Sequence, residues 1–108
     1  MPTYMVQANY TAEAWLAMTQ NPEDRAIAIN KLLAALGSRL LSLYFTCNEY
    51  DIIVIYEAPN ALTAHSASIA AFAAGHLKES KTTELFSSQE AVAAMEKAGR
   101  LSFDKPSQ

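Results

Sequence analysis

Residues 39–57 read RLLSLYFTCNEYDIIVIYE, two apolar segments on either side of Asn48-Glu49. Segments of this kind, separated by turn residues, predict antiparallel β-strands over residues 39–47 and 50–57, joined by a tight turn. Strict alternation divides the first strand into Leu41, Leu43, Phe45 and Cys47 on one face, and Leu40, Ser42, Tyr44 and Thr46 on the other. Because both faces are apolar, we expect helices to cover one face of the hairpin and something else to cover the other.

A strand and two helical segments are predicted before this hairpin. Residues 3–10 alternate as a strand, and Thr11 can cap a short helix that follows it. Asn21 and Pro22 are typical of a helix start, as cap and first-turn residue. The helix that they begin carries an apolar stripe, and Gly37 is placed to end it in a left-handed turn.

A helix and a fourth strand are predicted after the hairpin. Pro59-Asn60 opens an alanine-rich helix that reaches Gly75 or His76. Residues 81–86, KTTELF, predict the fourth strand.

Ser87 and Glu90 have the spacing of a capping box, which predicts a last helix ending near Gly99. The order β-α-β-β-α-β plus a C-terminal helix predicts an α+β fold, a ferredoxin-like antiparallel sheet. No internal repeat or linker stands out, so we expect one domain over residues 1–99 and a loose tail over residues 100–108.

The composition favours self-association. The chain has 108 residues, of which 51% are hydrophobic and 18% charged, which is more apolar and less charged than is usual for a soluble domain. A domain of this size has limited capacity to bury apolar surface internally. We therefore expect the chain to partner itself, as a homodimer or a higher even oligomer.

Charge and cysteine content argue against several other classes. The net charge of −3 and the absence of a basic run disfavour nucleic-acid binding. No apolar run approaches the roughly 20 residues that span a bilayer, and no signal peptide is apparent. The single cysteine, Cys47, leaves no disulfide framework or multi-cysteine metal site. We expect a reduced, cytoplasmic protein without a membrane partner and without a bound metal.

The turn between the two central strands resembles that of the GYD-domain family, whose members carry Gly-Tyr-Asp or Gly-Glu-Tyr-Asp there. This chain has Asn48-Glu49-Tyr50-Asp51, in which Asn replaces the glycine and tolerates left-handed backbone geometry better than most residues. Further segments resemble the family in the same order, over roughly residues 2–90: Pro2–Val6, Tyr44–Thr46, Glu57–Pro59 and Thr82–Leu85.

The resemblance implies a ferredoxin-like subunit related to the dimeric α+β barrel proteins, in which two sheets pack face to face with helices outside. Most members of the family have no assigned chemistry. The wider group includes cofactor-free monooxygenases and haem-handling proteins. The resemblance therefore implies an architecture and an assembly, but no single activity.

Two histidines are the first candidates for chemistry. His65 and His76 are eleven residues apart, which predicts one stripe of a single helix, with Ile69 and Phe72 between them. Their separation along that helix, roughly 16 Å, is too large for one metal ion to bridge. Either side chain could act as a catalytic base or as an axial haem ligand. The alternative is that both are ordinary hydrogen-bonded residues at a packing contact.

Polar and aromatic strand residues are the second set of candidates. Together with Phe72 they would line an apolar cleft with a few polar groups, which is typical of small-molecule sites: Asn9, Tyr10, Tyr44, Thr46 and Tyr50. The alternative is ordinary sheet packing. In the turn itself, Glu49 and Asp51 could bind a cation or transfer a proton, but a structural turn in which Asp51 or Asn48 bonds nearby backbone is favoured.

Three functional hypotheses follow from the sequence. The first is an uncharacterised, homo-oligomeric GYD-type domain that binds a small apolar ligand in a cavity between sheet faces. The second is an enzyme of the dimeric α+β barrel kind, acting on a small aromatic substrate or handling haem, with His76 as base or ligand and Asn9 or Tyr44 as its polar partner. The third is a structural or regulatory domain that binds another protein. No cofactor is expected under the first hypothesis.

Overall fold

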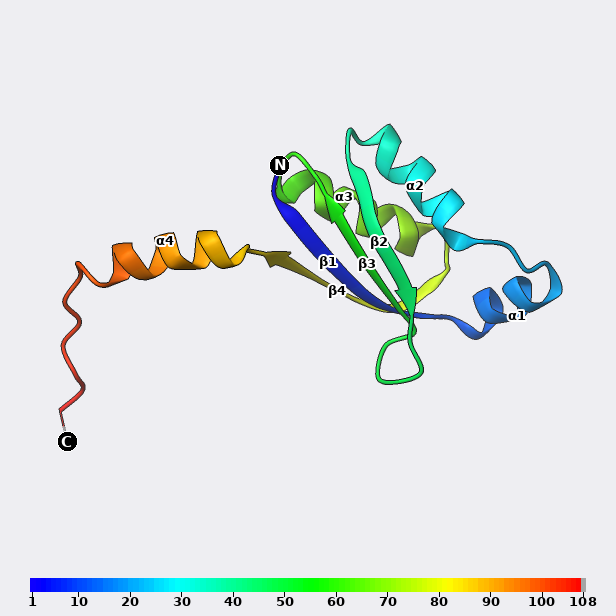
Figure 1. The fold of residues 1–108 in the computed structure, drawn as a ribbon. Helices are drawn as coiled ribbons and strands as arrows, with labels where there is room; N and C mark the ends of the chain where they lie inside the picture. The colour runs from blue at the N-terminus through cyan, green and yellow to red at the C-terminus, as the bar shows by residue number, and fades with distance from the viewer. Residues whose placement is uncertain (108) are drawn as a thin grey trace.

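A computed structural model describes residues 1–107 and shows one four-stranded antiparallel sheet with helices (Figure 1). In chain order the elements are β1 (Thr3–Tyr10), α1 (Ala12–Gln20), α2 (Arg25–Ala35), β2 (Arg39–Phe45), β3 (Ile52–Glu57), α3 (Ala61–Ala73), β4 (Leu77–Leu85) and α4 (Ser88–Ala98). The strand order is β2-β3-β1-β4, with every neighbouring pair antiparallel. This order confirms the predicted ferredoxin-like α+β fold.

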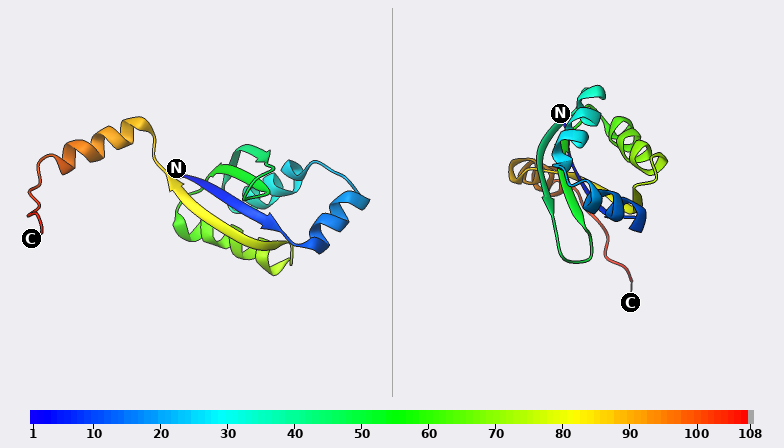
Figure 2. Two further views of the ribbon diagram at one scale, coloured as in Figure 1. Left: turned by 90° about the horizontal axis from the view of Figure 1, so that it is seen from below. Right: turned by 90° about the vertical axis from the view of Figure 1, so that its right-hand side faces the viewer.

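Helices α2 and α3 pack on one face of the sheet and leave the other face open (Figure 2). On β3 the side chains of Ile52, Val54 and Tyr56 are buried beneath the helices, whereas Ile53 and Ile55 are half-buried on the open face. The same alternation runs along β1 and β4 through the paired registers. Of the two apolar faces that the hairpin predicted, one is therefore covered by helices of this chain.

Tyr56 lies at the centre of the core, with 1% of its surface exposed. Its ring packs against that of Tyr4 on the neighbouring strand, with centroids 5.8 Å apart. Alanines of α3, including Ala64 and Ala67, are buried above the sheet. Their small side chains let this helix approach the tyrosine rings closely.

A β-bulge in β2 makes the predicted assignment of its faces wrong for Leu40. The register shifts between Leu40 and Ser42, so that Leu40 pairs with Tyr56 and Leu43 with Val54. Residues paired across an antiparallel ladder share a face, and Leu40 therefore lies on the helix side with Leu43. Strict alternation fails here because a bulge inserts one residue that the partner strand does not match.

The connection between β2 and β3 is longer than the predicted tight turn. The strands end at Phe45 and begin again at Ile52, so residues 46–51 form the loop. The backbone N–H of Thr46 donates to the carbonyl of Asp51 over 2.8 Å, which closes the base of the loop. The Thr46 hydroxyl also donates to the carbonyl of Tyr50. These two hydrogen bonds join Thr46 to Tyr50 and Asp51, so the loop extends beyond the predicted turn at Asn48-Glu49 on both sides.

The start of helix α2 differs from the prediction for a local reason, whereas its end is as predicted. Helix α2 begins at Arg25 and is capped by Asp24, whose carboxylate accepts from the N–H of Ala26 over 3.0 Å. Asn21 and Pro22 therefore lie in the link before it. The predicted left-handed end of the helix is confirmed, because Gly37 has a φ of +65°.

Strand β4 is longer than predicted, and the preceding helix is shorter. Helix α3 ends at Ala73, and β4 begins at Leu77 rather than at residue 81. Polar side chains over residues 78–81 give little strand signal of their own. They form a strand because β1 provides backbone partners along its full length, beginning with the pair Tyr10 and Leu77.

Helix α4 extends away from the rest of the molecule (Figure 1). The predicted capping box at its start is confirmed, since Ser87 and Glu90 bond each other's backbone N–H over 3.0 and 2.9 Å. None of its residues is buried against another element in the described part of the chain. The radius of gyration is 17.7 Å, against about 13 Å for a compact chain of 100 residues.

Residues 101–107 follow α4 without regular secondary structure. Among the described residues, no helix is long and apolar enough to cross a membrane.

Candidate functional site

An apolar cavity of about 100 Å³ lies between the sheet and helices α2 and α3. Its walls come from both layers, and its apolar lining includes Val6, Ala8, Ile52, Val54 and Tyr56 from the sheet, Ile29, Leu32 and Leu33 from α2, and Ala67 and Ala71 from α3. Alanines on α3, facing β-branched residues on the strands, leave this space unfilled because they have no side chain beyond Cβ. The cavity thus follows from the small residues of one helix.

Polar side chains gather at the end of the cavity nearest α1. Tyr10, Arg25 and His76 line the cavity and also line a second hollow of about 160 Å³ beside α1. The backbone of His76 is held there by the start of α1, because its carbonyl accepts from the N–H of Thr11 over 3.0 Å. These three side chains therefore separate two neighbouring hollows. Ser80 adds a hydroxyl to the lining of the first.

Arg25 is the most buried charged group of this site. Its side chain is 18% exposed, and its Nη1 lies 3.4 Å from the carboxylate of Glu23. The Arg25 guanidinium changes the pKa of the neighbouring Tyr10 phenol. Burial raises the pKa of Tyr10, while the hydrogen bond to Arg25 and its positive charge lower that pKa in part, and the charge of Asp51 raises it. Tyr10 therefore remains a neutral hydrogen-bonding group at physiological pH.

Two buried side-chain polar atoms in the described residues have no hydrogen-bond partner, and both belong to residues that line the cavity. They are Arg25 Nε and Ser80 Oγ. Buried polar groups in folded proteins are nearly always satisfied, and each exception requires an explanation. A polar group of a bound molecule is one way in which they could be satisfied.

Asp51 anchors the hairpin loop to the strand that carries Tyr10. Its carboxylate accepts from the backbone N–H of Tyr10 over 2.9 Å, and its own N–H donates to the carbonyl of Ala8 over 2.9 Å. The ring of Tyr10 in turn packs against Trp15 and Phe45, with centroids 5.5 and 6.1 Å away. The loop and the start of α1 are thus joined at one end of the cavity.

The GYD domain family matches residues 4–95. The chain belongs to the GYD-domain family. This match confirms the resemblance that the hairpin suggested. No curated protein matches the chain, so the family assignment brings no activity with it.

Two solved structures resemble this GYD domain in fold. MtbAldR has a TM-score of 0.58 at 14% identity, over 80% of this chain and 53% of its own. TTHA0845 from Thermus thermophilus has a TM-score of 0.52 at 13% identity, over 82% of this chain and 96% of its own. The chain therefore spans about half the length of MtbAldR. At these identities both structures support the fold alone.

The two predicted histidines of the GYD domain do not lie on one helical stripe. His65 is exposed on α3 and does not line the cavity. His76 lies beyond the end of α3, next to β4, because the helix ends at Ala73 and Gly75 takes a φ of +80°. Only His76 of the pair reaches the candidate site.

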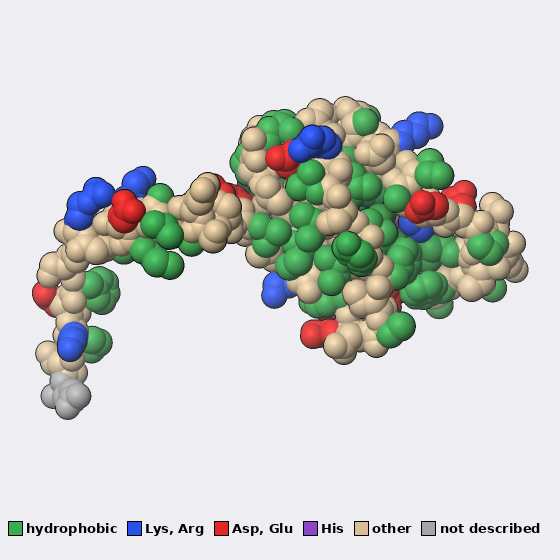
Figure 3. Space-filling model, in the orientation of Figure 1, with side chains coloured by type: hydrophobic (Ala, Val, Ile, Leu, Met, Phe, Trp, Pro, Cys, Tyr) green, Lys and Arg blue, Asp and Glu red, His purple; other side chains and the backbone are tan. Residues whose placement is uncertain are grey.

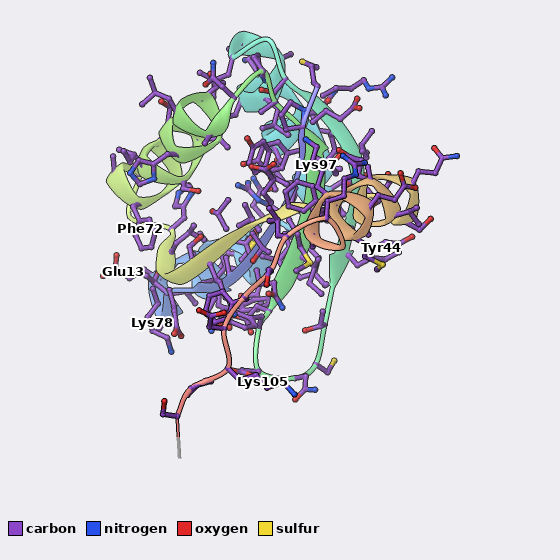
Figure 4. All side chains as sticks on the ribbon, turned by 90° about the vertical axis from the view of Figure 1, so that its left-hand side faces the viewer. Glu13, Tyr44, Phe72, Lys78, Lys97 and Lys105 are labelled. Carbon is purple, nitrogen blue, oxygen red and sulfur yellow. The ribbon has the colours of Figure 1, made fainter. Side chains whose placement is uncertain are left out.

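Of the six residues predicted to bind a ligand, only Tyr10 lines the cavity. Asn9 lies on the open face, where its amide donates to Glu79 over 3.3 Å. Tyr44 is 65% exposed on that same face, and Phe72 lies on the opposite side of the sheet, near the end of α3 (Figure 4). Thr46 and Tyr50 belong to the hairpin loop. The predicted cleft is therefore not formed within one chain.

The predicted turn residues form part of the hairpin loop of the GYD domain and have structural roles there. Asn48 and Glu49 are exposed at the tip of the loop, and Asp51 bonds backbone as described above. Its partner is 41 residues away rather than nearby in the sequence. Within the described residues, no cluster of three or more His, Cys, Asp or Glu side chains could hold a metal ion.

Arg25, Ser68 and Ser80 are the polar residues of the cavity lining that the sequence patterns missed. One signal did point to Arg25. A positive side chain in the first turn of a helix opposes the helix dipole, so it is seldom chosen for helix stability alone. For Ser80, its position on an edge strand of unknown length gave no indication of burial.

Proposed function

We propose that this GYD domain binds a small, largely apolar molecule in the cavity between its sheet and helices α2 and α3. The observation that carries the proposal is the cavity itself, an unfilled apolar space with a few polar groups at one end. Small-molecule sites commonly have this composition. The sequence had suggested a cavity between two sheet faces, and the proposal moves the ligand to the helix-covered face.

The volume limits the size of the ligand. An engineered apolar cavity of roughly 150 Å³ stays dry and binds benzene, whereas pockets for drug-sized ligands have roughly 300–1,000 Å³. At about 100 Å³, the cavity accommodates one small ring or a branched aliphatic group, with any further part of the ligand at the open mouth. This size favours a ligand much smaller than haem.

Ligand-induced stabilisation tests this proposal. A ligand that binds only the folded state at a hundred times its Kd stabilises that state by about 2.7 kcal/mol, so toluene or benzene should raise the melting temperature by several degrees. Ala71→Leu adds three carbons at a position that lines the cavity, and should abolish this increase. Ala70→Leu is the matched control, since Ala70 is exposed on the same helix and should leave the increase intact.

Absence of any increase with small arenes in the wild-type protein would argue against the proposal. An equal increase in the Ala71→Leu variant would also contradict it, because the ligand would then be binding elsewhere.

We further propose that the open sheet face is covered by the same face of a second copy. Hydrophobic side chains gather over the face seen in Figure 3. Met5, Ile53 and Ile55 are half-buried there, and Tyr44 is exposed. Large exposed apolar patches on small domains mark interaction sites. Pairing of identical faces forms a closed dimer and needs no other component.

Helix α4 supports the same assembly. It has eleven residues, which is too short for a stable isolated helix in water. Val92 and Met95 are exposed one turn apart on its surface. A second copy would supply the apolar surface that this helix lacks within its own chain.

A further inference from the structure

We infer that the molecule bound in the cavity carries an anionic head, a carboxylate, which is recognised by Arg25. This inference rests on the proposed function above and specifies the chemical class of its ligand: a small aromatic or branched aliphatic monocarboxylic acid. The apolar body would occupy the space beneath α3, and the carboxylate would lie at the end formed by Tyr10, Arg25 and His76.

The first support is the incomplete pairing of the Arg25 guanidinium. Its Nη1 has one carboxylate contact, to Glu23 at 3.4 Å, and the side chain of Glu23 is 58% exposed. Because its Glu23 partner is exposed and 3.4 Å away, this pair is weakened by solvent and contributes little to stability. The Nε of Arg25 is buried without a hydrogen-bond partner in the described structure. A guanidinium binds a carboxylate through two parallel N–H donors, and the side that carries Nε offers such a pair.

The second support is the sign of the charge at the cavity. Arg25 lines the cavity, and the described residues of the cavity lining include no Asp or Glu. The carboxylate of Asp51 accepts from the backbone of Tyr10, so it is already engaged. A cationic ligand would therefore meet a like charge in a partly desolvated site, whereas an anion would be paired there.

The third support is the pair of hydroxyl groups that line the same cavity as Arg25. The Ser80 hydroxyl is buried and lines the cavity without a partner in the described residues. Tyr10 contributes a phenol that lines the same cavity. Hydroxyl donors and a guanidinium together satisfy the two oxygens of a carboxylate. Among the described lining residues Arg25 is the only Lys or Arg, so the lining offers one guanidinium or ammonium group for one anionic head. One head group on an apolar body is therefore the ligand that fits.

The experiment compares two isosteres, phenylacetate and its neutral amide, phenylacetamide, by calorimetric titration of the full chain. Wild-type protein should bind phenylacetate at least tenfold more tightly than phenylacetamide. Arg25→Gln should remove this preference and leave the affinity for phenylacetamide within about twofold. Arg39→Gln is the matched control, since Arg39 pairs with Glu57 over 2.7 Å, is exposed, and does not line the cavity. The Arg39→Gln variant should keep the preference for phenylacetate over phenylacetamide.

Arg25→Lys provides a second variant, which keeps the positive charge and loses the planar fork. It should bind phenylacetate with intermediate affinity, and a thermal melt of each variant checks that it is folded. If phenylacetamide binds as tightly as phenylacetate, the inference is overturned while the proposed apolar site stands. If neither compound nor toluene binds, the proposed function itself fails.

Discussion

Tyr56 shows how a single side chain links the core of the domain to its behaviour in alkaline solution. It is the largest fully buried side chain, and its hydroxyl donates to the carbonyl of Ala64 over a long 3.4 Å. Burial, together with the nearby Tyr4, raises the pKa of Tyr56 to about 12 from a reference value of 10.0. The folded state therefore favours the neutral form of Tyr56.

This shift predicts that stability falls in strongly alkaline solution. Between pH 10 and 12 the unfolded chain loses the Tyr56 proton first, so the folded state holds more protons and the free energy of unfolding decreases as pH rises. One group contributes at most about 1.4 kcal/mol per pH unit to this decrease. Tyr56→Phe should change stability at neutral pH by no more than about 1 kcal/mol and make the alkaline decrease shallower.

Chemical denaturation at pH 8, 10 and 11 measures the effect. Equal slopes for the wild type and Tyr56→Phe would contradict the assigned role of Tyr56.

At the residue scale, the sequence predicted part of the site. Tyr10 and His76 were found from their residue types, and both line the cavity. Arg25 and Ser80 were missed because their importance depends on burial, which arises only when β4 pairs with β1 and α2 packs on the sheet. Tyr44 and Asn9 were chosen for their types, but alternation cannot say which face of a strand the helices cover.

At the element scale, sequence signals were accurate where residues a few positions apart determine the backbone geometry. The capping box at Ser87 and Glu90 and the left-handed glycine at position 37 were both predicted, because their geometry is determined within a few residues. Elements determined by partners were less accurate. Strand β4 extends over a polar segment because β1 supplies its hydrogen bonds, and the bulge at Leu40 depends on the register with β3.

The hairpin loop lies between these two cases. The Tyr50-Asp51 sequence indicates a family turn, and Asp51 was expected to bond backbone close by. Its carboxylate instead bonds the N–H of Tyr10 on β1. A contact between segments 41 residues apart is invisible to local turn rules, yet it connects the family signature with the polar end of the cavity.

At the scale of the whole molecule, the apolar composition predicted a second interface, and the open sheet face and the uncovered α4 provide surfaces for it. The dimer proposal predicts a solution mass of twice the 11.8 kDa of one chain at micromolar concentration. Ile55→Lys places a charge on the half-buried open face and should shift the protein to monomer. Leu62→Lys, at an exposed position of α3, is the control and should remain dimeric.

Light scattering coupled to size exclusion gives these masses. A wild-type mass of one chain would rule out the dimer. A monomeric Leu62→Lys variant would place the interface on the helices and not on the sheet.

The central claim is that a ligand enters the helix-covered face of the sheet, and methyl NMR tests it most directly. Strand β3 presents Ile52 and Val54 to the cavity and Ile53 and Ile55 to the open face, so neighbouring residues report on opposite sides. Titration with toluene should shift the methyl signals of Ile52 and Val54 and leave those of Ile53 and Ile55 in place. Shifts confined to Ile53 and Ile55, or no shifts at all, would show that the cavity is not the binding site.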